Sequence, residues 1–298
     1  MNTRALCLSL LLPLAVAWQP AFAEREIQET ADVHPQGEVE VSNVSGRIEV
    51  AGWDQERVEV TGTLGRGAEE LEFRTQGRHT LIRVKYPSGS KNVGASELRI
   101  RMPVESRLVV ASVAADVEVR ELRGAQRVNS VSGNIETVMS SEDVQLKTVS
   151  GDIRLVGTGS PGLLTITTVS GDVEVRGVAG EIVLQTVAGD LDIASAQLER
   201  ARIRTTNGDA TLHTGLAPEA RIEMEAVNGT LSLVLKGEPP DAEYTLETFN
   251  GRIENAFGPE PVRTSRYAPG TELRFTVGEG SARVNMETLN GAIILRAD

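Results

Sequence analysis

Sulfur chemistry, aromatic surfaces and histidine clusters are almost absent from this sequence. Its 298 residues include one cysteine and three histidines, and aromatic residues make up only 3% of the chain. Cys7 lies in an N-terminal apolar run that we expect to be removed, so the mature chain holds no thiol for a disulfide or for catalysis. With so few rings the core must be aliphatic, and segments rich in Val, Ile, Leu and Thr favour β-strands.

Long apolar segments are also missing after the first residues. Beyond residue 23 there is no run of about 18 apolar residues, so the sequence predicts no transmembrane segment there. Residues 1–23 instead have the pattern of a cleaved export signal, because Arg4 precedes an apolar run at 5–17 and Ala21-Phe22-Ala23 fits a cleavage site. We therefore expect an exported bacterial protein of the periplasm or the cell surface.

Positive charge is in deficit. The chain carries 42 acidic and 30 basic side chains, a formal net charge of −12. Loss of Arg4 with the signal leaves 29 basic residues and a net charge of −13. A negative domain repels phosphate backbones and anionic headgroups, so we expect neither nucleic acid nor an anionic bilayer as a partner.

What the chain does contain is a short repeated motif, centred on a glycine that follows Ser, Asn or Ala. From Gly133 onward successive glycines are 18, 20, 18, 19, 21, 22 and 40 residues apart. The last interval is two periods long, and we place a degenerate copy within it, at Thr271–Val277. This regularity predicts a repeat architecture. The copies are Val44-Ser45-Gly46, the degenerate Val113-Ala114-Ala115, Val131-Ser132-Gly133, Val149-Ser150-Gly151, Val169-Ser170-Gly171, Val187-Ala188-Gly189, Thr206-Asn207-Gly208, Val227-Asn228-Gly229, Phe249-Asn250-Gly251 and Leu289-Asn290-Gly291.

Each copy contains a change of direction. Apolar residues alternate on both sides of Ser150-Gly151, as in Leu146-x-Thr148 and Ile153-x-Leu155, but their parity changes across the motif. A straight strand would keep its parity, because side chains alternate with period two. We therefore expect a corner flanked by two strands, with glycine supplying a positive φ. Gly- and Pro-rich segments at 157–162, 214–218 and 236–241 predict a second, looser surface turn in each period.

Two arrangements fit these features. In an antiparallel meander each Asn-Gly would be a hairpin turn. In a solenoid each period would form one coil, and stacked corners would share one environment, which explains why the corner chemistry repeats. We favour the second and predict an all-β, single-chain β-solenoid (β-helix-like) with coils of 18–22 residues and an irregular N-terminal β cap.

The predicted organisation has three parts: the signal at 1–23, the cap region at 24–110 and regular solenoid repeats at 111–298. Strand-like alternation in the cap region occurs at 38–41, 57–61, 71–75, 81–86 and 98–102. No linker rich in Ser or Pro separates the cap region from the repeats.

The export signal, the early Val44-Ser45-Gly46 copy, the irregular strands and the Ser-Val-Ser-Gly-Asn and Thr-Val-Ser-Gly-Asp repeats together resemble the bacterial putative-adhesin β-strand-repeat family. The resemblance covers 39–295. It implies a β-solenoid, an envelope location and no established activity, and it carries no catalytic residues over to this chain. The sequence departs from the family pattern at Ala114-Ala115 and in 255–280.

The residue after the corner position is acidic or Asn in six successive copies. In a solenoid these side chains would stack about 4.8 Å apart, and like charges at that distance repel by roughly 1 kcal/mol in water. We expect each Asp to accept backbone N–H groups at its own corner. A weaker hypothesis is divalent-cation binding at Asp152, Asp172, Asp190 and Asp209. We call the whole set the acidic ladder: Asp116, Asn134, Asp152, Asp172, Asp190 and Asp209.

Other candidates for chemistry form no recognisable motif. The three histidines lack metal-ligand spacing, the repeated corner serines are not in a nucleophile-elbow motif, and there is no Walker motif. We predict no catalytic residues, no cofactor and no resident metal. The residues concerned are His34, His79 and His213, and Ser132, Ser150 and Ser170.

The sequence favours a non-enzymatic, exported envelope protein whose adhesin-like solenoid presents a binding or scaffolding surface. Its partner would be an unknown envelope protein, a glycan or a second copy. The alternative is a glycan-active lyase or hydrolase on the same scaffold, which needs paired carboxylates in a groove. Scattered aromatic residues and carboxylates that repeat with the coil argue against that alternative. A purely structural or envelope-stress accessory role is a third hypothesis.

Overall fold

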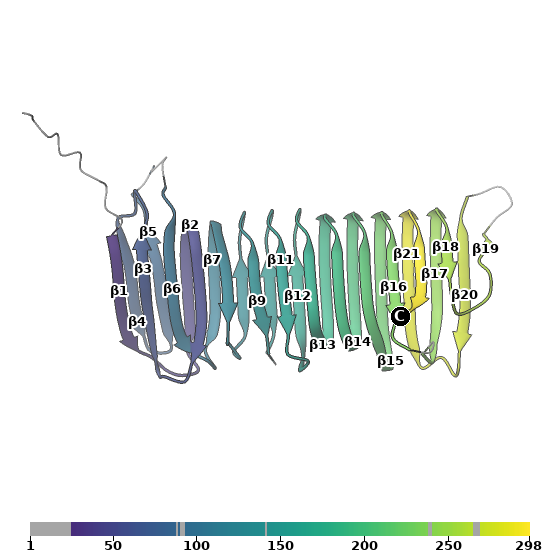
Figure 1. Cartoon of the computed structure of the whole chain (residues 1–298), viewed down its shortest axis with the longest axis horizontal. Helices are drawn as coiled ribbons and strands as arrows, with labels where there is room; N and C mark the ends of the chain where they lie inside the picture. Colours follow the sequence, from purple (N-terminus) through teal and green to yellow (C-terminus); the bar gives the residue numbers. More distant parts are fainter. Residues whose placement is uncertain (1–24, 88, 90–92, 141, 238–239, 265–268) are drawn as a thin grey trace, which may run out of the picture.

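The computed structural model of the chain describes residues 25–298, apart from 88, 90–92, 141, 238–239 and 265–268. These residues form 22 β-strands and no helix, joined in one hydrogen-bonded sheet that runs as a long row of strands (Figure 1). The predicted all-β class is confirmed. The predicted signal at 1–23, with Arg4, Cys7 and Ala21-Phe22-Ala23, lies outside the described residues. The part of the chain that is described contains no helix with the length and apolarity to cross a membrane.

Parallel pairs form the middle of the row. β10 pairs in parallel with β8 and β12, and β11 pairs in parallel with β9 and β13, so strands one period apart lie side by side. Antiparallel pairing across the Ser-Gly corners is the wrong model, and the predicted parallel stacking is confirmed. The strands are β7 (Arg107–Arg120), β8 (Gln126–Asn129), β9 (Ile135–Met139), β10 (Val144–Lys147), β11 (Ile153–Gly157), β12 (Pro161–Thr167), β13 (Val173–Ala188), β14 (Leu191–Asn207), β15 (Ala210–Asn228) and β16 (Leu231–Leu235).

We call the two strand segments joined by one corner a rung. The segments before the corners form the pre-corner face of the stack, and those after the corners form the post-corner face. Inward side chains of both faces, such as Leu146 and Ile153, belong to one buried aliphatic core. The result is a solenoid-like stack in which each rung is hydrogen-bonded to its neighbours on both sides.

The N-terminal end departs from this pattern. β2 pairs in parallel with β5, β6 and β7, whereas the β1–β3, β3–β6 and β4–β5 pairs are antiparallel. All five strand-like segments predicted for the cap region are present. β7 continues across residue 110, and the division into domains stays a prediction. The strands are β1 (Arg25–Asp32), β2 (Glu38–Trp53), β3 (Arg57–Leu64), β4 (Glu70–Gln76), β5 (His79–Lys85) and β6 (Ser96–Pro103).

The C-terminal end is not built in chain order. β21 pairs in parallel with both β15 and β17, and β22 with both β16 and β18, so the last rung of the sequence lies between two earlier ones (Figure 1). The degenerate copy predicted at Thr271–Val277 is wrong, because β20 pairs antiparallel with β17. Alternation marks a strand but not its direction, so the sequence pattern could not separate these cases. The strands are β17 (Ala242–Asn250), β18 (Ile253–Asn255), β19 (Val262–Arg263), β20 (Thr271–Val277), β21 (Ala282–Asn290) and β22 (Ile293–Ala297).

The corner explains the repeated glycine. Gly151 has a φ of 148°, and a Cβ at this position would overlap the carbonyl oxygen of Gly133 in the preceding rung. Glycine is therefore needed both for the backbone conformation and for the close stacking of corners. Parity changes as predicted, since Leu146 and Ile153 are buried while Val149 between them is half exposed.

Two local expectations change. Residues 214–218, predicted as a surface loop, lie inside β15, where the strand passes through an irregular register. The degenerate copy at Ala114-Ala115 keeps its place in the stack, because Ala115 pairs with Gly46 and is fully buried.

Candidate functional site

One edge of the stack carries most of the exposed apolar side chains. Eight of the ten large hydrophobic residues that are exposed in the described chain directly precede a corner, and each is 41–49% exposed. Parallel bridges such as Ser132–Ser150 and Ser150–Ser170 hold these corners one rung apart, about 4.8 Å. Thr206 occupies the equivalent place in one rung. We call this set the apolar ridge: Val113, Val131, Val149, Val169, Val187, Val227, Leu289 and Phe249.

A buried hydroxyl lies under each ridge residue except Val227. The Oγ1 of Thr168 donates to the carbonyl of Ser170, and that of Thr186 donates to the carbonyl of Ala188. Because the residue before each ridge position is buried and points inwards, the next side chain must point outwards. Sequence reasoning missed this role, although a Ser or Thr recurs at the position and could have revealed it. The buried residues are Ser112, Ser130, Thr148, Thr168, Thr186, Thr248 and Thr288.

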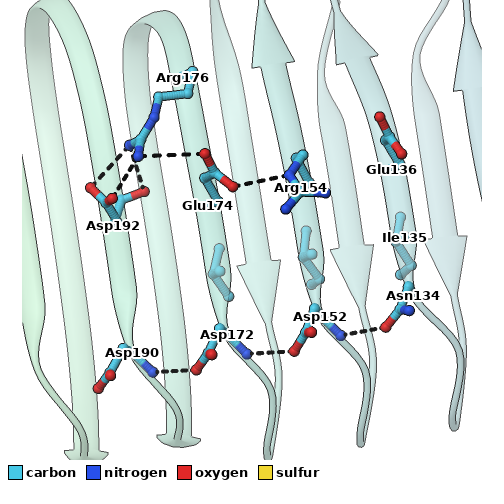
Figure 2. Close-up of a pocket in the computed structure, with 12 residues that line it drawn as sticks. Asn134, Ile135, Glu136, Asp152, Arg154, Asp172, Glu174, Arg176, Asp190 and Asp192 are labelled. Carbon is cyan, nitrogen blue, oxygen red and sulfur yellow. Dashed lines mark hydrogen bonds and ion pairs between the residues drawn. The ribbon is translucent and has the colours of Figure 1, made fainter.

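The acidic ladder runs beside the corners and connects rungs (Figure 2). Asp152 Oδ1 accepts the backbone N–H of Asp172 at 3.0 Å, and Asp172 Oδ1 accepts that of Asp190 at 2.9 Å. The prediction that each Asp bonds within its own corner is therefore wrong. The N–H groups that follow the corner glycines are directed along the stack, where the nearest acceptor belongs to the preceding rung. Equivalent bonds join the rest of the ladder, from Asp116 through Asn134 to Asp152, and from Asp190 through Asp209 to Thr230.

The structure brings the candidate cation ligands into one column. Asp152, Asp172, Asp190 and Asp209 each use Oδ1 to accept a backbone N–H. Within the described residues, no group of three or more His, Cys, Asp or Glu side chains is placed to hold a metal ion. The cation hypothesis thus stays a prediction without a ligand cluster behind it.

A groove of about 570 Å³ lies on the post-corner face above the ladder (Figure 2). Arg154 lies 2.9 Å from Glu174, and Arg176 donates to both carboxylate oxygens of Asp192. The hydrogen bond from Arg176 holds the pKa of Asp192 below its usual value, against the opposing effect of partial burial. A general acid must keep its proton near neutral pH. The Asp192 carboxyl is instead held ionised, so it does not suit the proton-donor role in glycan hydrolysis.

The other sequence candidates stay apart. His79 lies 3.2 Å from the Glu40 carboxylate, whereas His34 and His213 lie on other parts of the chain. Among the corner serines, Ser132 donates its hydroxyl to the Val113 carbonyl, and Ser170 donates to that of Val149. These hydroxyls serve the stacking of corners.

The chain was compared with curated proteins, with solved structures and with protein-family models. No curated protein matches the chain. Among solved structures it is similar to a putative adhesin from Bacteroides fragilis, with 11% identity over 92% of this chain and 98% of the other and a TM-score of 0.45. It is also similar to a putative lipid binding protein from Parabacteroides distasonis, with 12% identity, coverages of 91% and 96% and a TM-score of 0.48. A putative adhesin from Parabacteroides merdae gives 8% identity, the same coverages and a TM-score of 0.28.

The assignment is carried by the family match rather than by these likenesses. The model of the Toastrack DUF4097 family matches residues 127–296, which hold the regular rungs and the C-terminal insertion. The resemblance drawn from the Val-Ser-Gly repeats is confirmed, and the chain belongs to the Toastrack DUF4097 family.

Proposed function

We propose that this protein is a non-enzymatic, exported envelope protein that presents the apolar ridge as a binding surface. The observation that carries the proposal is the ridge itself. Soluble monomers rarely expose a long apolar patch, and those that do commonly use it for recognition. The ridge has eight apolar side chains, with Thr206 as the polar residue between Val187 and Val227. In this proposal the chain is a single β-solenoid with 24–110 as its N-terminal cap, and the apolar run at 5–17 directs its export to the periplasm or the cell surface.

The energetics require a partner that contacts most of the ridge. Burying a whole valine side chain stabilises a complex by about 1.5–3 kcal/mol, so burying the exposed half contributes roughly 1 kcal/mol per rung. Association itself costs an estimated 4–15 kcal/mol. One or two rungs cannot offset that cost, whereas eight can, which favours a long, straight interface along the stack.

The negative charge beside the ridge limits which kind of surface can bind there. The acidic ladder lies three residues after the ridge position in its rungs, so carboxylates flank the apolar side chains. A second copy would bring the same carboxylates and the same negative net charge to the interface. The ridge therefore suits a protein surface that combines apolar with basic side chains.

Site-specific photocrosslinking in the native host tests this proposal. A photoreactive amino acid at Val149 or Val169 should give one common protein adduct from both positions. Val156 is the matched control, because it is equally exposed at 46% but lies on the post-corner face away from the ridge. The Val131→Ser/Val187→Ser background should reduce the adduct at least tenfold. Equal labelling from Val156, or no adduct from the ridge, would overturn the proposal.

The enzyme alternative has a separate outcome. Turnover of an envelope polysaccharide that a single carboxylate substitution abolishes would replace the binding proposal. The substitution to include is Glu174→Gln, since Glu174 lies centrally in the post-corner groove between Arg154 and Arg176 (Figure 2).

A further inference from the structure

A row of arginines crosses the pre-corner face. Parallel register places Glu181 of β13 beside Arg200 of β14, Arg200 beside Arg221 of β15, and Arg221 beside Arg283 of β21. Glu243 of β17 closes the row next to Arg283. Three arginines therefore occupy successive strands at one level, in a chain whose net charge is −12.

The two outer arginines have acidic partners and the central one does not. Arg200 lies 2.7 Å from the Glu181 carboxylate, and Arg283 lies 3.9 Å from that of Glu243. Arg221 has guanidinium groups on both sides and, among the described residues, makes no ion pair. Like charges one strand apart repel by roughly 1 kcal/mol in water. The row thus lacks the counter-charge that its two ends possess.

A small groove of about 170 Å³ opens at this place. Its charged lining consists of Arg200, Arg202 and Arg221 with Glu181 and Glu223, and Arg283 lies beside Arg221 just outside it. Glu223 is bound to Arg202 at 2.8 Å, so it does not neutralise Arg221. A water occupies about 30 Å³, so the groove has room for a group the size of several waters. Guanidinium groups match the two oxygens of a carboxylate, sulfate or phosphate better than a point charge does.

We propose that Arg221, with Arg200 and Arg283 on the flanking strands, binds an oxyanion group. The chemical class is a carboxylate, sulfate or phosphate, either as a free ion or as a substituent on an envelope glycan. The row lies six residues before the ridge position of its own rung, so the site is separate from the apolar ridge and does not depend on the proposed function.

Titration of the mature chain with sodium sulfate tests the site, at ionic strength matched with sodium chloride. We expect a saturable shift of the Arg221 side-chain Nε–Hε resonance with a dissociation constant in the millimolar range. Arg221→Gln should weaken binding, measured by calorimetry, at least tenfold. Arg296→Gln is the matched control, because Arg296 is also exposed and makes no ion pair in the described chain but has no arginine beside it.

A second variant separates loss of the binding site from loss of folding. Arg221→Glu would lie between Arg200 and Arg283, so without sulfate it should raise the melting temperature by about 2 °C while abolishing the sulfate response. Sodium phosphate and tri-galacturonate form the other arms. Binding of all three ions indicates a general oxyanion site, and binding of tri-galacturonate alone indicates a glycan carboxylate. An unchanged sulfate response in Arg221→Gln, or an equal loss in Arg296→Gln, would overturn the proposal.

Discussion

Two halves of the corner column bind neighbouring rungs through different side chains. In the first half, from Asp116 to Asp209, the residue after the corner position accepts the backbone N–H of the next rung. In the second half the residue before the glycine is asparagine, and the amides of Asn228, Asn290 and Asn250 each donate to the amide oxygen of the asparagine in a neighbouring rung at 2.8–2.9 Å. We call this second set the asparagine ladder: Asn207, Asn228, Asn290 and Asn250. The two ladders overlap in the rung that contains Asn207 and Asp209.

The difference shows what the corner requires. A carboxylate can only accept, so an Asp ladder works only where backbone N–H groups supply the donors. An amide both donates and accepts, so asparagines bond to one another and need no charge. Each corner thus needs one continuous side-chain ladder, and either chemistry provides it. The first solution leaves a column of negative charge next to the ridge, whereas the asparagine ladder itself adds no charge there.

The largest expected effect concerns the corner glycine, which both halves share. Gly151→Ala and Gly229→Ala would each place a Cβ against the carbonyl oxygen of the preceding corner glycine, at a positive φ. We expect each to lower the free energy of unfolding by about 3 kcal/mol, measured by chemical denaturation. Gly159→Ala is the control, because its φ is 84° but no atom lies within 4 Å of the added Cβ. It should cost only about 1 kcal/mol.

A large loss of unfolding free energy for only one of Gly151→Ala and Gly229→Ala would contradict the premise that the two halves share the same corner. The corners beside the two ladders would then differ in packing, and the stabilities of ladder variants could not be compared directly. Similar costs in both halves would assign the difference between them to the side chains alone.

The effect of intermediate size comes from exchanging Asp and Asn between the two ladders. Asp172→Asn keeps the acceptor for Asp190 and removes a charge, so we expect stability within about 0.5 kcal/mol of the parent. Asn228→Asp keeps the acceptor for Asn290 but loses the donor to Asn207, so it should cost about 1 kcal/mol. Asp172→Ala removes one ladder bond and should cost about 1 kcal/mol, whereas Asn228→Ala removes two and should cost about 2 kcal/mol. Chemical denaturation of the four variants measures all of these effects.

The dependence of the melting temperature on salt also distinguishes the two ladders. Screening weakens repulsion between stacked carboxylates, so the melting temperature of the parent should rise between low and physiological salt, and that of Asp172→Asn should rise less. Equal costs for Asp172→Asn and Asn228→Asp would mean that the ladders do not differ in the way their hydrogen bonds indicate.

Much of this architecture could be predicted from the sequence. The parity change around Ser150-Gly151 gave the corner, and the regular spacing of glycines gave the parallel stack. The insertion of β21 between β15 and β17 could not be predicted, because spacing records chain order rather than spatial order. The apolar ridge was not predicted for a different reason. A valine in a Val-Ser-Gly motif has the pattern of a core residue, but the buried residue before it already takes the inward position, so alternation turns the valine outwards.

The smallest expected effect concerns the Arg176–Asp192 ion pair, which lies beside the acidic ladder (Figure 2). Arg176 lowers the pKa of Asp192 by hydrogen bonding, so the pair stabilises the fold above about pH 4, and that contribution is lost as pH falls through the lowered pKa. Asp192 is 53% exposed, so we expect only a few tenths of a kcal/mol. Asp192→Asn and Arg176→Gln should each flatten the loss of stability between about pH 5 and pH 3, and the double variant should flatten it no further. If the parent and Asp192→Asn lose stability equally over that range, the acid sensitivity of the fold does not come from the Arg176–Asp192 pair.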